Sequence, residues 1–137
     1  MSQNPDSEQP IIAAAVIAHA GRVLLVRRRI SEGALSWQLP AGAVEAGESP
    51  QQAAVREARE ETTLVVTSTK VLGTRVHPDT GRTMVYVACD IVSGEAAVGD
   101  PEEVAEFVWA SRADLPTLNP RGFFGPVQQY LDAMLVT

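Results

Sequence analysis

The most constrained stretch of this sequence is a capped run of helix-forming residues, 50–62 (PQQAAVREAREET). Almost every residue in this run favours a helix. Ser49 is suited to cap the first turn, with Pro50 at the first helical position and Gln52 at the third. We therefore predict a helix from about Pro50 to Thr62.

Three glutamates crowd one side of the predicted helix. At about 100° per residue, Glu57, Glu60 and Glu61 fall within an arc of roughly 100°. Carboxylates three and four residues apart repel one another and destabilise a helix. Arg56 and Arg59 flank the arc, so a solvated face of Glu/Arg pairs is one interpretation. The other is a hard divalent cation held by oxygen ligands, which would offset the repulsion better.

The wider pattern around the glutamates favours the cation. Residues 42–64 read GAVEAGESPQQAAVREAREETTL and resemble the Nudix box, G-x5-E-x7-R-E-U-x-E-E-x-G-U, where U is a bulky aliphatic. All six spacings are matched, by Gly42, Glu48, Arg56, Glu57, Glu60 and Glu61. Six such matches arise by chance in about one chain in 10⁵. The chain thus resembles the Nudix hydrolase family of MutT-like nucleotide pyrophosphohydrolases, over roughly residues 11–135.

Two positions depart from the family pattern. Ala58 stands where a larger aliphatic residue is usual, and Thr63 stands where the family has glycine. A glycine at that place normally takes the left-handed conformation at a helix end, which a β-branched residue resists. The geometry of the helix exit is therefore open, although no carboxylate is lost.

The resemblance implies a fold and a metal centre. The fold would be a Nudix α/β/α sandwich with a mixed central sheet, and the cofactor Mg²⁺ (or Mn²⁺). Glu60 and Glu61 would be metal ligands, and Glu57 would be a ligand or the general base. The backbone carbonyl of Gly42 or Ala41 would complete the metal shell.

The resemblance also gives two residues of the box supporting roles. Arg56 would fix a carboxylate by ion pairing, as part of the catalytic group. Glu48 would orient the loop ahead of the helix.

Further candidates lie outside the box. Many family members take an extra metal ligand from a later loop, and Glu103 is the first candidate here, with Glu102 second. A solvated loop acid is an equally weighted alternative. Arg27 and Arg28 end a strand that would face the box, so each is a candidate for substrate phosphate, or alternatively a solvated strand end.

Other polar and aromatic residues are weaker candidates. Asn119 lies where relatives that act on oxidised guanine nucleotides place a base-reading asparagine, although loop asparagines usually serve turns. His77 is expected at the surface of a turn. Tyr86 and Phe123 are expected in core or rim packing, with base stacking as the alternative.

The predicted elements run strands, helix, strands, helix, which favours a mixed sheet covered by helices. Residues 1–10 are expected to be a disordered tail before one Nudix domain, 11–137. We expect strands over 11–19, 23–28, 37–39, 64–66, 69–76, 83–92 and 106–110, a loop over 29–36, mixed strand and loop over 94–100, a helix start at 111–114 and a helix over 125–136.

Composition limits the possible partners. The net charge of −6 argues against nucleic acid and anionic membranes, but a bound cation would still admit a small anionic substrate. Cys89 is the sole cysteine, which excludes an intrachain disulfide and suits a cytoplasmic protein. The expected partner is a small nucleotide, and the expected state is a monomer or homodimer.

The most favoured activity is hydrolysis of a pyrophosphate bond in a nucleoside diphosphate derivative, from a nucleoside triphosphate to a monophosphate and pyrophosphate. An ADP-ribose or nucleotide-sugar pyrophosphatase is the alternative. Pro78, 15 residues after Thr63, and the LPAG stretch resemble that branch, but the long N-terminal portion typical of it is missing. A non-catalytic nucleotide sensor is the rival from another class, although sensors of this family usually lose box glutamates.

Overall fold

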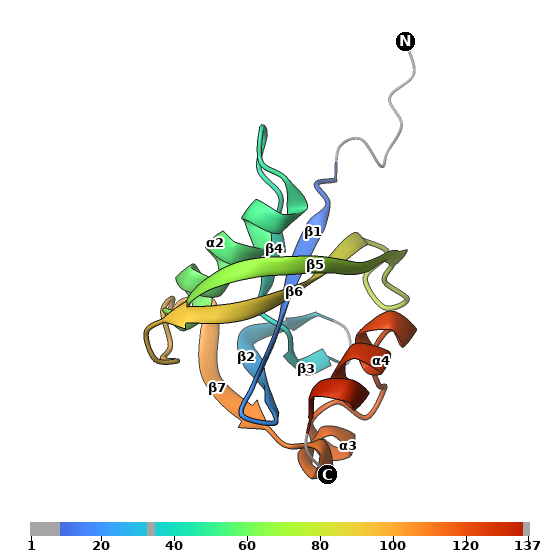
Figure 1. Cartoon of the computed structure of the whole chain (residues 1–137). Coiled ribbons are helices and arrows are strands. Elements are labelled where there is room, and N and C mark those ends of the chain that lie inside the picture. Colours follow the sequence, from blue (N-terminus) through green and yellow to red (C-terminus); the bar gives the residue numbers. More distant parts are fainter. Residues whose placement is uncertain (1–8, 33–34, 136–137) are drawn as a thin grey trace.

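The computed structural model describes residues 9–32 and 35–135, whose strands form one mixed sheet (Figure 1). The strand order is β3-β2-β1-β6-β5, with β4 added beside β1 and β7 beside β2. The strands are β1 (Ile12–His19), β2 (Arg22–Glu32), β3 (Leu35–Gln38), β4 (Ala41–Ala43), β5 (Val65–Val76), β6 (Thr83–Ser93) and β7 (Val104–Ala110). The pairing of β1 with β6 is parallel and the other pairings are antiparallel, which makes the sheet mixed.

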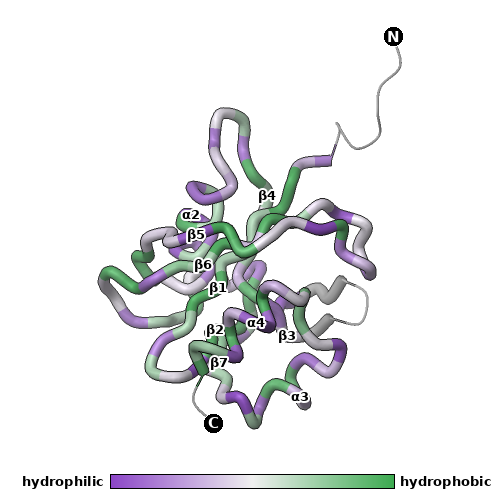
Figure 2. Tube along the Cα trace, turned by 45° about the vertical axis from the view of Figure 1, so that its right-hand side comes forward, coloured by the Kyte–Doolittle hydropathy of each residue, from purple (hydrophilic) through white to green (hydrophobic). Residues whose placement is uncertain are grey.

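Helices cover both faces of the sheet, so the predicted α/β/α sandwich is confirmed. Helix α2 (Pro50–Thr62) and helix α4 (Gly125–Met134) lie on opposite sides of the β1–β6 pair (Figure 1). Strand β1 supplies both cores by alternation: Ala13, Ala15 and Ile17 pack with α2, while Ala14 and Val16 pack with α4. Hydrophobic residues gather along these central strands (Figure 2).

The predicted bounds of helix α2 are confirmed. Ser49 accepts a hydrogen bond from the Gln52 backbone, and the Gln52 side chain accepts one from the Ser49 backbone, which completes a capping box. Ala53, Ala54 and Ala58 are fully buried against the sheet. The small side chain of Ala58 lets the helix lie close to the strands, which accounts for one departure from the family pattern.

The exit of helix α2 takes the geometry that the family glycine normally takes. Thr63 has φ 65° and ψ −2°, and its backbone N–H donates to the Arg59 carbonyl. Its hydroxyl donates to the Glu95 carbonyl at 2.8 Å. Thr63 therefore adopts the left-handed conformation despite its branched side chain, with a hydrogen bond to a neighbouring loop as support.

Residues 94–100 form a loop that closes the end of helix α2, and the strand character expected there is wrong. The Ala97 N–H donates to the Thr62 carbonyl and the Gly99 N–H donates to the Glu61 carbonyl, each at 2.9 Å. A helix end leaves such carbonyls without partners inside the helix. The backbone of this segment is used for capping, so it does not join the sheet.

Several other boundaries differ from expectation. Strand β2 continues to Glu32 and β3 begins at Leu35, where a loop was expected over 29–36. Strand β5 is one element with register shifts against β6, and the two strands expected over 64–76 are merged. The helix start at 111–114 is a 3-10 turn, Arg112–Asp114, followed by α3 (Leu115–Leu118).

Parts of the expected ends lie outside the described residues. These are residues 1–8 of the predicted tail and residues 136–137. None of the described helices is long and apolar enough to cross a bilayer.

We predict that replacing Thr63 with glycine leaves the protein as stable as wild type or slightly more stable. Glycine removes the strain of a positive φ, about 1 kcal/mol, and loses an exposed hydroxyl hydrogen bond of similar value. Thr63→Ala is the matched control, because it loses the same bond and keeps the strain, and we expect it to be destabilised by about 1 kcal/mol. Chemical denaturation measures both. A glycine variant less stable than the alanine variant would contradict the geometry.

Candidate active site

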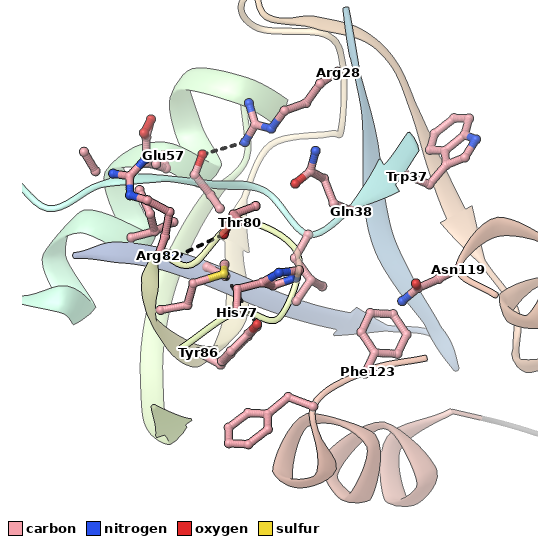
Figure 3. A pocket seen from close by; sticks show the side chains of 18 of the residues that line it. Arg28, Trp37, Gln38, Glu57, His77, Thr80, Arg82, Tyr86, Asn119 and Phe123 are labelled. Carbon is pink, nitrogen blue, oxygen red and sulfur yellow. Dashed lines mark hydrogen bonds between the residues drawn. The ribbon is translucent and has the colours of Figure 1, made fainter. Parts of the chain in front are cut away.

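A cavity of about 430 Å³ lies over strands β1, β4 and β6, on the sheet face opposite helix α2. Its floor includes Ile12, Ala14, Met84 and Tyr86, and Glu57 of helix α2 reaches it beside strand β4 (Figure 3). In Figure 3, Glu57 and Arg82 lie toward one side of the cavity, and Trp37, Asn119 and Phe123 toward the other. The cavity therefore has a charged side and an aromatic side.

Glu57 lies directly against the backbone of Gly42. A Cβ atom at Gly42 would stand 1.6 Å from Oε2 of Glu57, so any larger residue would displace the carboxylate. Glu57 is only 7% exposed. Burial, together with the nearby charges of Glu61 and Glu60, raises the pKa of Glu57 to about 8. The box glycine is thus needed to admit this carboxylate.

Glu61 is almost completely buried and is held by Arg28. The Arg28 guanidinium donates to Glu61 at 3.2 Å and to the Ala41 carbonyl at 2.7 Å, and lies 3.8 Å from a Glu103 oxygen. Burial raises the pKa of Glu61 to about 7, although Arg28 and the Ala41 N–H act in the opposite direction. Arg28 therefore joins strand β2, strand β4, helix α2 and the Glu103 loop at one point.

Arg56 organises the remaining acids of the box. Its Nε lies 2.8 Å from Glu48, and a terminal nitrogen donates to the Ala43 carbonyl at 2.9 Å. The other terminal nitrogen lies 3.2 Å from Glu60 and 3.5 Å from Glu57. The hydrogen bond from Arg56 lowers the pKa of Glu48, while the Glu48 carboxylate also accepts the Glu45 N–H. Glu48 thus holds the loop ahead of helix α2.

The carboxylates of the box have the oxygen chemistry that suits a hard divalent cation, but their side chains are not gathered around one point. Within the described ranges, no three His, Cys, Asp or Glu side chains are arranged to hold a metal ion. The Glu60 side chain is 53% exposed and turned to Arg56. Buried like-charged carboxylates repel one another unless protons or a cation compensate.

The later-loop acids reach the cavity, as the family resemblance led us to expect. Glu102 and Glu103 both belong to its lining, and Glu103 is near Arg28. The Glu103 side chain remains 59% exposed. Arg28 contacts both Glu103 and Glu61 of helix α2, so the later-loop acid lies near the box glutamates, and its ligand role stays a prediction.

The two adjacent arginines of strand β2 separate to opposite faces. Arg28 lines the cavity, whereas Arg27 lies outside it and pairs with Glu106 of strand β7. Successive side chains of a strand point to opposite faces, so only one could face the carboxylates. The expected contact of Arg27 with substrate is not supported by its position, and Arg28 is committed to protein groups.

The loop residues lie closer to the cavity than their sequence context indicated. Asn119 lines the aromatic side and its amide nitrogen donates to the Gly122 carbonyl at 3.3 Å. His77 lines the cavity and is only 9% exposed, so the expected surface position is wrong. Tyr86 and Phe123 also line the cavity, Tyr86 as a buried residue of strand β6.

Sequence reasoning missed Gln38, Arg75 and Arg82, all of which line the cavity. A signal for Arg82 was available, because it directly precedes the predicted strand 83–92 and has the same parity as Met84 and Tyr86 on one face of that strand. Gln38 follows a tryptophan in a strand that is too short for its periodicity to predict which side chains face a cavity. Two of the missed residues have a buried donor atom that a ligand could use. Gln38 Nε2 and Arg82 Nε are buried without a hydrogen-bond partner among the described residues.

Comparisons with known proteins identify the family of this chain. The NUDIX domain family matches residues 8–129. An ADP-ribose pyrophosphatase of Methanocaldococcus jannaschii is 33% identical over 97 residues, covering 67% of this chain and 57% of that protein. An NAD-capped RNA hydrolase, NudC, of Salmonella typhi is 32% identical over 120 residues, covering 85% of this chain and 46% of that protein.

A solved structure shows the same fold. The crystal structure of a NUDIX hydrolase from Nitrosomonas europaea has a TM-score of 0.75 at 23% identity, covering 96% of this chain and 73% of that one. The chain belongs to the Nudix family, because the family model matches most of its length. It spans about half the length of the two curated relatives.

We expect the metal-free protein to lose stability as pH rises from roughly 4.5 to 8. The native state keeps protons on Glu57 and Glu61, whose pKa values are raised to about 8 and about 7 from 4.5. The unfolded state has released those protons, so the loss amounts to a few kcal/mol, on the order of 1.4 kcal/mol per pKa unit at most. Thermal melting in chelator across this range measures it, and Glu57→Gln should flatten the slope. Stability that rises over this range would contradict the burial of the two acids.

We predict that Gly42→Ala folds like wild type but loses activity by about a hundredfold, because the added methyl group displaces the Glu57 carboxylate. The displaced atoms are the end of a flexible side chain, so the fold tolerates the change. Gly125→Ala is the control, since a Cβ there meets nothing within 4 Å. Activity assays and melting curves of both variants test the prediction. Wild-type activity in Gly42→Ala would show that the position of Glu57 is unimportant.

Proposed function

We propose that this protein hydrolyses a pyrophosphate bond in a nucleoside diphosphate derivative, with the help of a divalent cation. The observation that carries the proposal is the Glu57 carboxylate, buried against Gly42 at the edge of the cavity and flanked by Glu61 and Glu60. Crowded acids cost stability in a domain that only has to fold. Their position beside a cavity is explained by a charged phosphate ligand bound through a cation.

The proposed cation ligands come from helix α2, from strand β4 and from the loop before strand β7. They are the carboxylates of Glu57, Glu60, Glu61 and Glu103, with the backbone carbonyl of Gly42 or Ala41. Mg²⁺ (or Mn²⁺), when bound, would neutralise phosphate charge and lower the pKa of a coordinated water. Oxygen-only ligands are what these hard cations prefer.

The protein itself supplies position and proton transfer. Arg28 holds Glu61, and Arg56 holds Glu48, Glu57 and Glu60. Glu57, whose carboxylate touches the cavity, acts as a cation ligand or accepts the proton of the attacking water. Correct placement of the acids and the phosphate provides much of the rate enhancement in such reactions.

The aromatic side of the cavity suits the nucleoside. Trp37 and Phe123 offer ring faces, and Asn119 and Gln38 offer polar groups beside them (Figure 3). Because the amide nitrogen of Asn119 is used by Gly122, its oxygen is the atom placed to accept a hydrogen bond from a base. A base on this side directs the phosphates toward Glu57.

Two classes of substrate are candidates, and they differ in the group that is attached beyond the scissile bond. A nucleoside triphosphate, including an oxidised one, is the class first expected from the sequence. An ADP-ribose or NAD-type dinucleotide is favoured by the two relatives, whose names describe an ADP-ribose pyrophosphatase and an NAD-capped RNA hydrolase. A panel of triphosphates, ADP-ribose, NAD and dinucleoside polyphosphates with Mg²⁺ would rank them.

We predict that turnover on this panel requires Mg²⁺ or Mn²⁺ and stops in excess chelator. Glu60→Gln and Glu61→Gln should each lower kcat by about a hundredfold or more, because each removes a proposed cation ligand. Glu95→Gln, at an exposed loop position, should behave like wild type. Full turnover in chelator would refute the cation requirement, and nucleotide binding without turnover would identify a sensor.

A further inference from the structure

Arg82 lines the cavity and has no acidic partner among the described residues. It immediately precedes strand β6 and shares the cavity-facing parity of Met84 and Tyr86. Among the described residues, no carboxylate lies within 4.0 Å of its guanidinium. In a chain of net charge −6, this leaves a positive charge unneutralised beside the cavity.

The hydrogen bonds of Arg82 fix its position but leave one buried donor unused. A terminal nitrogen donates to the Pro10 carbonyl at 3.2 Å, and the backbone N–H donates to the Thr80 hydroxyl at 3.2 Å. The Nε atom is buried and has no partner in the part of the chain that the structure describes. Buried donors in native proteins are nearly always paired, so this one points to an acceptor that the described residues do not supply.

Arg75, the other arginine of the same hairpin, provides the contrast. Its Nε donates to the Tyr86 hydroxyl at 3.1 Å, and its guanidinium lies 5.1 Å from the Phe124 ring centre and 5.6 Å from that of Tyr86. Protein groups thus engage Arg75 through a hydrogen bond and two aromatic rings. In the part of the chain that the structure describes, Arg82 has no aromatic or side-chain partner of this kind, which leaves its guanidinium more available to a ligand than that of Arg75.

The sheet register gives the spacing between Arg82 and the strand beside Glu57, and Figure 3 gives the side of the cavity on which Arg82 lies. Gly42 of β4 pairs with Ala13 of β1, which pairs with Val85 of β6. Two strand spacings, about 10 Å, therefore separate the strand beside Glu57 from the strand that Arg82 precedes. In Figure 3 Arg82 lies on the Glu57 side of the cavity, opposite Trp37 and Phe123.

We propose that Arg82 binds phosphate on the far side of the scissile bond, and so favours substrates that carry additional phosphate there. A nucleotide with its base on the aromatic side would pass its phosphates along Glu57 toward Arg82. A guanidinium is well matched to phosphate oxygens, and the unpaired Nε is one of its donors. The position relative to the scissile bond rests on the proposed function, whereas the capacity of Arg82 to bind phosphate does not.

A binding experiment tests the anion site without any chemistry. Inorganic pyrophosphate is titrated calorimetrically into the full chain in the presence of chelator. We expect Arg82→Gln to weaken binding by about tenfold to a hundredfold, as for the loss of a hydrogen bond to a charged group. Arg22→Gln makes the same charge change at an exposed position away from the cavity and should bind like wild type. Equal affinities of the Arg82 and Arg22 variants, or no binding by wild type, would overturn the proposal.

A kinetic experiment tests the selectivity. The ratio of kcat/KM for deoxyguanosine triphosphate to kcat/KM for ADP-ribose is measured for wild type, Arg82→Lys and Arg82→Gln. We expect the ratio to fall about tenfold or more in Arg82→Gln, mainly through KM, with a partial effect in Arg82→Lys because charge is retained without the Nε donor. An unchanged ratio would overturn the selectivity.

The two experiments separate the two proposals. If no nucleotide is hydrolysed but pyrophosphate binding depends on Arg82, the proposed function fails and the anion site stands. If nucleotides are hydrolysed but neither binding nor selectivity depends on Arg82, the function stands and the anion site fails. Should Arg82→Gln melt well below wild type, Arg82→Lys supplies the same comparisons.

Discussion

The rest of the structure depends on the burial of like-charged carboxylates between helix α2 and strand β4. Glu57 and Glu61 lie almost out of water, which is costly for charged groups unless they are compensated. Arg28 compensates Glu61 from the cavity side, and Arg56 compensates Glu57 from the helix side. Because Arg28 also holds the Ala41 carbonyl, the same contact fixes strand β4 and with it the glycine that admits Glu57.

Local chemistry explains which parts of the fold the sequence predicted well. Helix α2 was predicted to its end residues because its capping box and its terminal residues act within a few positions. The layered fold followed from the family resemblance. Segment 94–100 was misjudged because its role is to satisfy carbonyls of a helix more than thirty residues earlier, a contact that no local pattern reveals.

The candidate site was predicted unevenly for a related reason. The box glutamates were found because their spacing on one helix is itself the signal. Which of Arg27 and Arg28 faces the carboxylates depends on strand parity and register, and a one-residue change reverses the answer. Arg82 and Gln38 enter the cavity only because β1 brings β4 and β6 together, which is a property of the assembled sheet.

The loop that closes helix α2 has a mechanical consequence for the carboxylates. Gly99 binds the backbone of Glu61, and four residues later the same segment presents Glu103 to Arg28. Glu61 and Glu103 are therefore connected through one short segment, residues 99–103, whose backbone is hydrogen-bonded to helix α2. A displacement of this segment would therefore shift the backbone contact of Glu61 and the Glu103 side chain together, and with them both acids that contact Arg28.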